Sequence, residues 1–265
     1  MKDVIVSSDN KFYKLLKKLD KKKYRDENNI FKAEGEKFLN EDINFNKIIV
    51  KESRYEYFNG KYNIERHDNL TVLKDNLFDE ISTQENSQGI ILLYSRNLNS
   101  INDIRGDIVI VDDIQDPGNI GTIIRTMIAT GFSNLILTKG AVDVYNPKTV
   151  RATMGGIFKI NIIYETPENI VKFLNENEYF TIATALHKDS ISYEQVVQKE
   201  RGKNAYIFGH EGGGVSDYFL ENSDVKAIIP LYGDIESLNV SVAVGVFLYK
   251  MREKMEETGV KYPFE

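Results

Sequence analysis

The sequence predicts an α/β protein that has a parallel sheet in its C-terminal part and a smaller α/β domain before it. After about residue 106, apolar runs rich in Val and Ile alternate with segments of helical pattern. These runs are continuous, which indicates strands covered on both faces, as in a parallel sheet. Before residue 94 the apolar runs are shorter and mixed with polar segments, which favours a separate small domain.

The composition excludes several classes of protein. A chain of 265 residues is long enough for one large domain or two smaller ones. It contains no Cys, which excludes a disulfide framework, a thiolate nucleophile and a Cys-ligated zinc. The three His are scattered, so no metal site is expected. No apolar run suits a signal peptide or a membrane span, so we expect a cytoplasmic protein.

Charge is distributed unevenly along the chain. The formal net charge is −6, which argues weakly against non-specific coating of nucleic acid. Residues 1–37 nevertheless contain eleven basic and seven acidic side chains. This local excess predicts either a surface that faces RNA phosphates or simply the solvated face of a helix.

An amphipathic helix is expected over residues 10–19. Phe12, Leu15, Leu16 and Leu19 recur at i, i+3, i+4 and i+7, with lysines between them. That spacing places the apolar side chains on one helical face.

The rest of the N-terminal domain contains short strands and a second helix. Runs of β-branched and apolar residues at 47–50 and 89–93 predict strands, and residues 75–82 have a helical pattern. Residues 94–106 are polar and rich in turn formers, which predicts a domain boundary. The predicted domains are residues 1–98 and 106–265.

The C-terminal elements alternate between strand and helix. Strands are expected at 107–113, 134–139, 180–186, 205–209 and 227–230, and helices from about Asn119, around Thr149 and from Leu238. The last helix begins apolar nearly all round and ends charged. Its first half is therefore expected to be buried, against the sheet or against a second subunit.

The first candidate functional segment is DDIQDPGNIGTIIRT, residues 112–126. It follows a predicted strand, and ligands of open α/β sheets bind outside the carboxyl ends of strands. Asn119 and Arg125 are less than two helical turns apart, so both are placed to overlook one cleft. The alternative is that Asn119 only caps the helix and Arg125 is a surface residue.

The second segment is IFGHEGGGVSD, residues 207–217, a strand end followed by glycines. No Lys follows the glycines, and Glu211 places a carboxylate where a phosphate would sit, which argues against an ATP or dinucleotide site. The loop suits an uncharged or cationic ligand, for instance a nucleoside that carries a sulfonium. The alternative is a tight connection with three glycines at positive φ.

The third segment is IPLYGDIESLNVSVAVG, residues 229–245. We expect Ser237 to be the N-cap of the last helix, where free N–H groups and the amide of Asn239 are available to a ligand. The alternative is a buried helix whose Ser and Asn satisfy only backbone groups.

In this order the three segments resemble the motifs of the SpoU (TrmH-type) RNA 2′-O-methyltransferases of the SPOUT class. The Asn-x-Gly-x-x-x-Arg motif corresponds to 119–125, and Gly-x-Glu-x-x-Gly to 209–214. The Ile-Pro and Ser-Leu-Asn-Val-Ser elements correspond to 229–230 and 237–241. The resemblance covers 107–257.

The N-terminal part resembles the RNA-substrate-binding domain often fused to such enzymes. The segments that carry this likeness are Tyr-Arg-Asp-Glu at 24–27, Phe-Lys-Ala-Glu-Gly-Glu-Lys at 31–37 and Gln-Gly at 88–89. That domain has a small α/β fold related to ribosomal proteins that bind kinked RNA.

The family likeness implies a parallel-sheet SPOUT domain with a trefoil knot, although general topological rules weigh against knots. It implies a homodimer formed through the catalytic domain and S-adenosylmethionine as the cofactor. The implied substrate is RNA, with ribosomal RNA favoured and tRNA as the alternative. A non-catalytic RNA-binding protein is a further alternative.

The same likeness assigns the site residues. The implied cofactor-binding residues are Thr184, Leu186, Gly209, Ile229 and Leu238, and the implied catalytic residues are Asn119, Arg125, Glu211, Ser237 and Asn239. Arg125 is the family's proposed activator of the ribose hydroxyl. Because a guanidinium is a poor base, we favour a role in binding a phosphate or stabilising the developing alkoxide.

Overall fold

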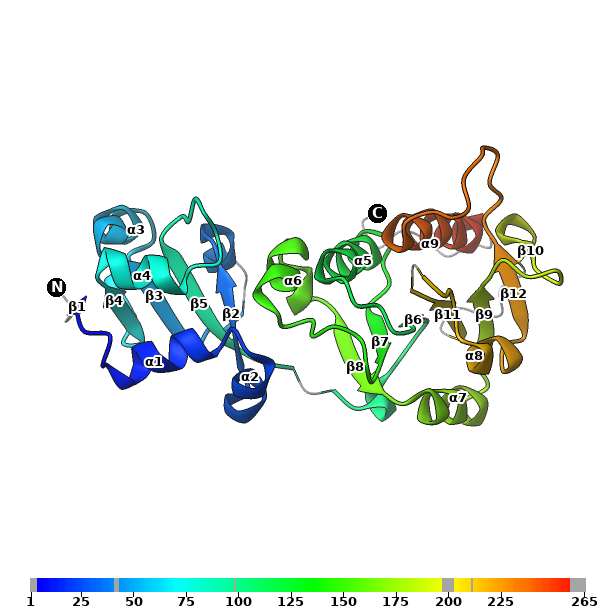
Figure 1. Cartoon of the computed structure of the whole chain (residues 1–265), viewed down its shortest axis with the longest axis horizontal. Helices are drawn as coiled ribbons and strands as arrows, with labels where there is room; N and C mark the ends of the chain where they lie inside the picture. Colours follow the sequence, from blue (N-terminus) through cyan, green and yellow to red (C-terminus); the bar gives the residue numbers. More distant parts are fainter. Residues whose placement is uncertain (1–3, 41–42, 98, 197–202, 211, 258–265) are drawn as a thin grey trace. The chain divides into compact units, whose positions relative to one another are not determined.

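The computed structural model forms two compact units (Figure 1). One unit comprises Met1–Arg96 together with Asp143–Phe158, and the other comprises Asn97–Val142 with Lys159–Glu265. The structure describes residues 4–40, 43–97, 99–196, 203–210 and 212–257. No helix within these ranges is long and apolar enough to cross a membrane.

The first unit is built on a five-stranded mixed sheet in the order β1-β4-β3-β5-β2. Strands β1, β4 and β3 are parallel, whereas β5 runs antiparallel to β3 and to β2. Its strands are β1 (Val4–Ile5), β2 (Ile30–Glu34), β3 (Lys47–Lys51), β4 (Leu70–Leu73) and β5 (Ile90–Ser95). Its helices are α1 (Lys11–Lys18), α2 (Lys22–Asn28), α3 (Tyr55–Tyr62), α4 (Asp75–Ile81) and α6 (Pro147–Ala152).

The predicted helix at 10–19 is confirmed as α1. Asn10 caps it, since its Oδ1 accepts hydrogen bonds from the backbone N–H groups of Phe12 at 2.8 Å and Tyr13 at 3.2 Å. Leu16 and Leu19 pack with α4 against one face of the sheet, as the spacing predicts. The strands and helix expected at 47–50, 89–93 and 75–82 are β3, β5 and α4.

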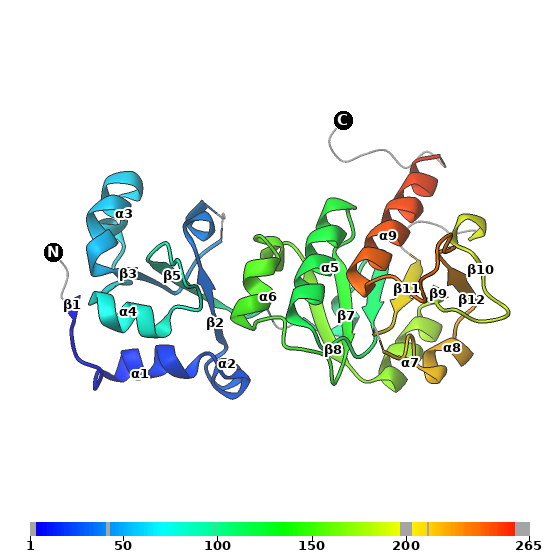
Figure 2. The same ribbon diagram turned by 45° about the horizontal axis from the view of Figure 1, so that its top comes forward.

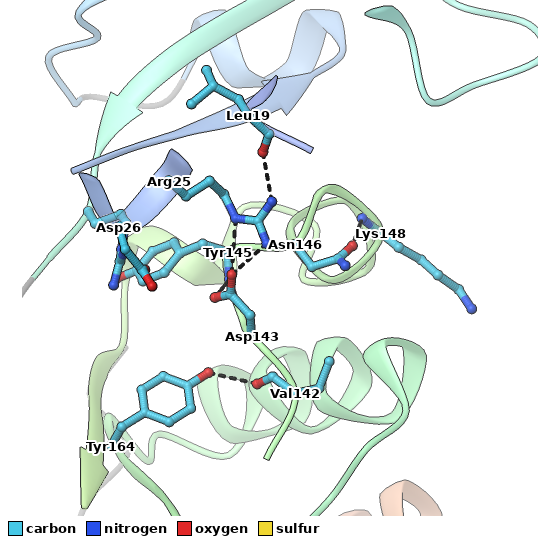
Figure 3. A network of polar contacts seen from close by, with 10 residues as sticks. Leu19, Arg25, Asp26, Val142, Asp143, Tyr145, Asn146, Lys148 and Tyr164 are labelled. Carbon is cyan, nitrogen blue, oxygen red and sulfur yellow. Dashed lines mark hydrogen bonds and ion pairs between the residues drawn. The ribbon is translucent and has the colours of Figure 1, made fainter. Parts of the chain in front are cut away.

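Residues 143–158 are part of the first unit, although the chain reaches them only after two strands of the second unit, β6 (Ile108–Val111) and β7 (Asn134–Thr138). Figure 3 shows Arg25 of α2 at the centre of this contact. Its Nε and Nη2 donate to one oxygen of Asp143 at 3.0 and 2.6 Å, and its Nη1 donates to the carbonyl of Leu19 at 2.7 Å. Tyr145 packs on Phe31 of β2, with ring centroids 4.9 Å apart.

The basic N-terminal segment is only partly available to a partner. Arg25 and Lys32 are each only 2% exposed, and Lys32 donates to the carbonyl of Ile81 and pairs with Asp20. These two cations are therefore internal, which contradicts the idea that the whole excess faces phosphates. Lys11 and Lys21 are exposed.

The second unit is a seven-stranded, fully parallel sheet, which confirms the predicted fold class. The strand order is β10-β12-β9-β11-β6-β7-β8. Its strands are β6 (Ile108–Val111), β7 (Asn134–Thr138), β8 (Asn161–Glu165), β9 (Phe180–Thr184), β10 (Ile191–Ser192), β11 (Asn204–Phe208) and β12 (Val225–Ile228). Its helices are α5 (Pro117–Ala129), α7 (Pro167–Glu176), α8 (Asp217–Glu221) and α9 (Val240–Glu257).

Helices cover both faces of this sheet, which is why its strands are apolar throughout. Figure 2 shows α5 and α9 on one face and α7 with α8 on the other. Strand β11 illustrates the alternation. Ala205 and Ile207 join the core beneath α7 and α8, whereas the rings of Tyr206 and Phe208 contact Phe247 of α9.

Two predicted helix starts are wrong. Helix α5 begins at Pro117, and Asp116 is its N-cap because Asp116 Oδ1 accepts from the N–H of Asn119 at 2.8 Å. Asn119 is therefore not a cap. Helix α9 begins at Val240 rather than Leu238. Its cap is Asn239 and not Ser237, as its hydrogen bonds show below.

Candidate active site

A cavity of about 230 Å³ lies at the carboxyl ends of three strands of the second unit. These strands, β12, β9 and β11, are neighbours in the sheet. All five residues predicted to bind the cofactor line it, namely Thr184, Leu186, Gly209, Ile229 and Leu238. The structure thus brings together segments that are up to 54 positions apart (238 − 184) at the sheet edge where α/β proteins bind ligands.

The loop after β11 is shaped by two glycines. A Cβ on Gly209 would lie 1.8 Å from the carbonyl carbon of Gly214, so no larger residue fits there. His210 and Gly214 exchange backbone hydrogen bonds of 3.2 and 2.9 Å, and Gly214 has a φ of +69°. Of the three glycines that follow Glu211, only Gly214 has a positive φ, so the alternative of three such residues is wrong.

The amide of Asn239 connects the starts of α9 and α5. Its Oδ1 accepts from the backbone N–H of Ser241 at 3.0 Å and from the Ser241 hydroxyl at 2.6 Å, so this oxygen caps α9. Its Nδ2 donates to Asn119 Oδ1 at 3.1 Å. Two predicted catalytic residues from distant motifs are thereby in direct contact.

The other three predicted catalytic residues are placed differently. Ser237 is exposed and lines the cavity. Arg125 is exposed on α5, does not line the cavity, and makes no hydrogen bond or ion pair with any residue the structure describes. Glu211 lies outside the described residues.

Three residues near the cavity were not assigned a role from the sequence. His210 and Glu236 line it. Asp112, at the end of β6, is buried and accepts a hydrogen bond from the N–H of Ser216 at 3.0 Å, which holds the glycine-rich segment to the sheet. In the sequence, Asp112 is marked by two adjacent aspartates at a strand end. Glu236 is marked as an acidic residue directly before Ser237.

The walls suit an organic ligand that is uncharged or positively charged. They combine backbone groups of the glycine loop with apolar side chains such as Leu231, Val240 and Ala243. Among the described residues that line the cavity there is one carboxylate and no Lys or Arg. Within the same part of the chain there is no group of three or more His, Cys, Asp or Glu that would hold a metal ion.

A parallel α/β unit with a cavity at the carboxyl edge of its sheet belongs to the class of α/β proteins that bind a ligand there. The sequence profile of the SpoU rRNA methylase family matches residues 107–249, and that of the MRM3-like substrate-binding domain matches residues 10–92. The chain belongs to the SpoU rRNA methylase family. The predicted RNA methyltransferase activity and S-adenosylmethionine cofactor are confirmed by this membership and by the relatives.

Similarity to some individual proteins extends over nearly the whole chain, and similarity to others over little more than half of it. A 23S rRNA (guanosine(2553)-2′-O)-methyltransferase, RlmP of Bacillus subtilis, is 32% identical over 94% of this chain and 98% of its own length. A tRNA (guanosine(18)-2′-O)-methyltransferase of Aquifex aeolicus is 30% identical over 58% of this chain and 72% of its own. The crystal structure of an AdoMet-bound rRNA methyltransferase from Sinorhizobium meliloti has a TM-score of 0.84 and 28% identity, and the match covers 96% of this chain and 98% of that one.

Proposed function

We propose that this chain transfers the methyl group of S-adenosylmethionine to a ribose 2′-hydroxyl of ribosomal RNA. The proposed binding of the cofactor rests on one observation, which is that a single cavity is lined by Thr184, Leu186, Gly209, Ile229 and Leu238. Ribosomal RNA is favoured because the RlmP relative matches both units, whereas the Aquifex tRNA enzyme matches little more than half of the chain. A tRNA substrate is the second candidate.

The chain's own groups would act mainly by positioning. S-adenosylmethionine, when bound, supplies an electrophilic methyl group on a sulfonium. Asn119 and Asn239 would hold the reacting centre, since their amides are already fixed to each other. We assign Ser237 and Glu211 to the same centre. We propose that Arg125 binds the RNA phosphate or stabilises the developing alkoxide, because a guanidinium is a poor base.

We propose that the two predicted domains have different functions. Residues 1–98 would bind the RNA, and residues 106–265 would hold the cofactor and carry the reaction. The MRM3-like match over 10–92 supports the first assignment, and the SpoU match over 107–249 supports the second. A cytoplasmic location stays a prediction.

We further propose a homodimer that forms through the catalytic domain, and a trefoil knot in that domain. An apolar stripe on α9 supports the dimer, because Val242, Val246 and Tyr249 share one helical face and remain 50%, 38% and 56% exposed. Tyr249→Glu should convert the dimer to monomer in analytical ultracentrifugation. A wild-type chain that sediments as a monomer at micromolar concentration would contradict the dimer.

The function is tested by binding and transfer in the presence of a chelator. The protein should bind S-adenosylmethionine in calorimetry without added metal, and should methylate ribosomal RNA more than tRNA. Arg125→Ala should reduce transfer by about 10²-fold or more, as for loss of a transition-state donor, while cofactor affinity stays within a few fold. Absence of cofactor binding by the wild type, or of any 2′-O-methyl product on either RNA, would refute the proposal.

A further inference from the structure

Glu236 places a carboxylate at the cofactor cavity. It lies in the loop between β12 and α9, directly before Ser237, and lines the cavity together with Leu231 and Leu238. It is the one carboxylate among the described residues that do so. Its side chain is exposed and makes no hydrogen bond or ion pair with the part of the chain that the structure describes. A carboxylate without a protein partner at a ligand cavity is available to a cation.

The cofactor and the product of the reaction differ in charge at one atom. S-adenosylmethionine carries a positive sulfonium, whereas S-adenosylhomocysteine has a neutral thioether, and both share the adenosine and the amino-acid ends. Apolar walls and backbone groups do not respond to the charge of the sulfur, so we expect them to contribute similar binding energy to both molecules. The two molecules also differ by the transferred methyl group, but a preference that depends on charge, and therefore on salt, requires a group that responds to the sulfonium.

We infer that Glu236 makes the cavity prefer S-adenosylmethionine over S-adenosylhomocysteine by attracting the sulfonium. This inference rests on the proposed cofactor. During transfer the methyl carbon forms a bond to the ribose oxygen, the sulfur keeps the electron pair of the broken bond, and the hydroxyl proton is released to water. The positive charge that Glu236 attracts is thereby removed in the same step. The product is held less tightly than the cofactor, which favours exchange after each turnover.

The size of the effect follows from the exposure of Glu236. Two opposite unit charges attract only weakly in bulk water and several times more strongly near a protein surface. Because the carboxylate is exposed, salt and water screen it. We therefore expect a preference of about 3- to 10-fold at low ionic strength, at roughly 1.4 kcal/mol per tenfold, and a smaller one at high ionic strength.

Glu236→Gln tests this inference because it keeps the shape of the side chain and removes its charge. The dissociation constants of S-adenosylmethionine and S-adenosylhomocysteine are measured by calorimetry at one fixed pH for every variant. The variant should bind S-adenosylmethionine about 3- to 10-fold more weakly and S-adenosylhomocysteine within about 2-fold of wild type. Asp234→Asn is the matched control, since Asp234 is in the same loop but does not line the cavity. It should leave both constants unchanged.

Salt provides a second readout. Raising the ionic strength from about 0.05 to 0.5 M should reduce the preference of the wild type for S-adenosylmethionine and should not change that of Glu236→Gln. Equal weakening of both ligands in the variant would mean that Glu236 supports the loop or contacts the shared ammonium, and would overturn the inference. An unchanged ratio of the two constants would overturn it as well. In both cases wild-type cofactor binding would remain, so the proposed function would stand.

Discussion

The side-chain amide of Asn239 has two separable roles, one at each of its polar atoms. The oxygen caps α9 through Ser241, and the nitrogen donates to Asn119. A helix cap stabilises a protein by about 1 kcal/mol, whereas the contact with Asn119 orients a residue of the proposed reacting centre. Substitutions that change one atom and keep the other distinguish the two roles.

Asn239→Asp should retain stability and lose activity. Its carboxylate keeps the capping oxygen, and a negative charge is favourable at a helix N-terminus, but it removes the donor to Asn119. Asn239→Ala should lose about 1 kcal/mol of unfolding free energy and activity together. Urea unfolding and methyl transfer, measured on both variants, check this. Full activity in Asn239→Asp would show that the contact with Asn119 has no catalytic importance.

The starts of α5 and α9 show how far the sequence predicts which residue caps a helix. Ser237 and Asn239 are both good capping residues, two positions apart. Which one caps depends on whose oxygen faces the N–H of Ser241, and that is set by the loop from β12. The sequence indicates the start of α5 more clearly, because Asp116 precedes Pro117 and Pro favours the first helical position.

At the scale of elements, the periodic segments were predictable and the long-range contacts were not. Helix α1 and the apolar strands β6 and β11 follow from patterns within a few residues. Helix α7 is not among the helices expected from the sequence, although Thr166 and Pro167 mark its start. The burial of α6 against β2 has no local signal, since it depends on residues more than 100 positions apart in the chain.

The ion pair between Arg25 and Asp143 is the clearest of those long-range contacts. The two side chains are 2% and 10% exposed, and Tyr145 N–H donates to the second oxygen of Asp143 at 3.0 Å. Removing one partner of a buried pair leaves an uncompensated charge, whereas replacing both by apolar residues is often close to neutral.

Arg25→Met should therefore lower the unfolding free energy by about 3 to 5 kcal/mol. The double variant Arg25→Met with Asp143→Leu should recover much of that loss, because no charge is left buried. Unfolding by urea, followed by circular dichroism, measures both. Lys14→Met is a control, since its pair with Asp9 is exposed and worth less than about 1 kcal/mol. A small effect of Arg25→Met, similar to that of Lys14→Met, would contradict the structure of this contact.

At the scale of the whole molecule, the boundary in sequence and the boundary in space differ. The methylase profile spans 107–249 without interruption, but residues Asp143–Phe158 within it pack into the unit formed by the N-terminal sheet. The chain therefore passes between the units three times, after Arg96, after Val142 and after Phe158. The first unit is therefore completed by residues that lie inside the methylase profile.

Deleting residues 1–96 should consequently damage more than RNA binding. The deletion leaves Asp143 without Arg25 and exposes side chains of the same segment that are otherwise buried, among them Val144, Tyr145 and Ile157. An exposed apolar surface of this kind promotes association. We expect the truncated chain to aggregate in size-exclusion chromatography with light scattering, and to bind a dye specific for apolar surface, whereas the full chain does neither.

Point variants in the full chain are therefore the better test of RNA binding by the N-terminal unit. Lys11 and Lys21 are exposed there, and each phosphate contact contributes about 0.7 to 0.9 to the slope of log affinity against log salt. Lys11→Gln with Lys21→Gln should flatten that slope by up to about 1.8 and weaken RNA binding while S-adenosylmethionine binding is unchanged. Lys172→Gln, on α7 of the other unit, is the control, since it also removes an exposed cation. An unchanged slope in the double variant would mean that these lysines face solvent and do not contact RNA phosphates.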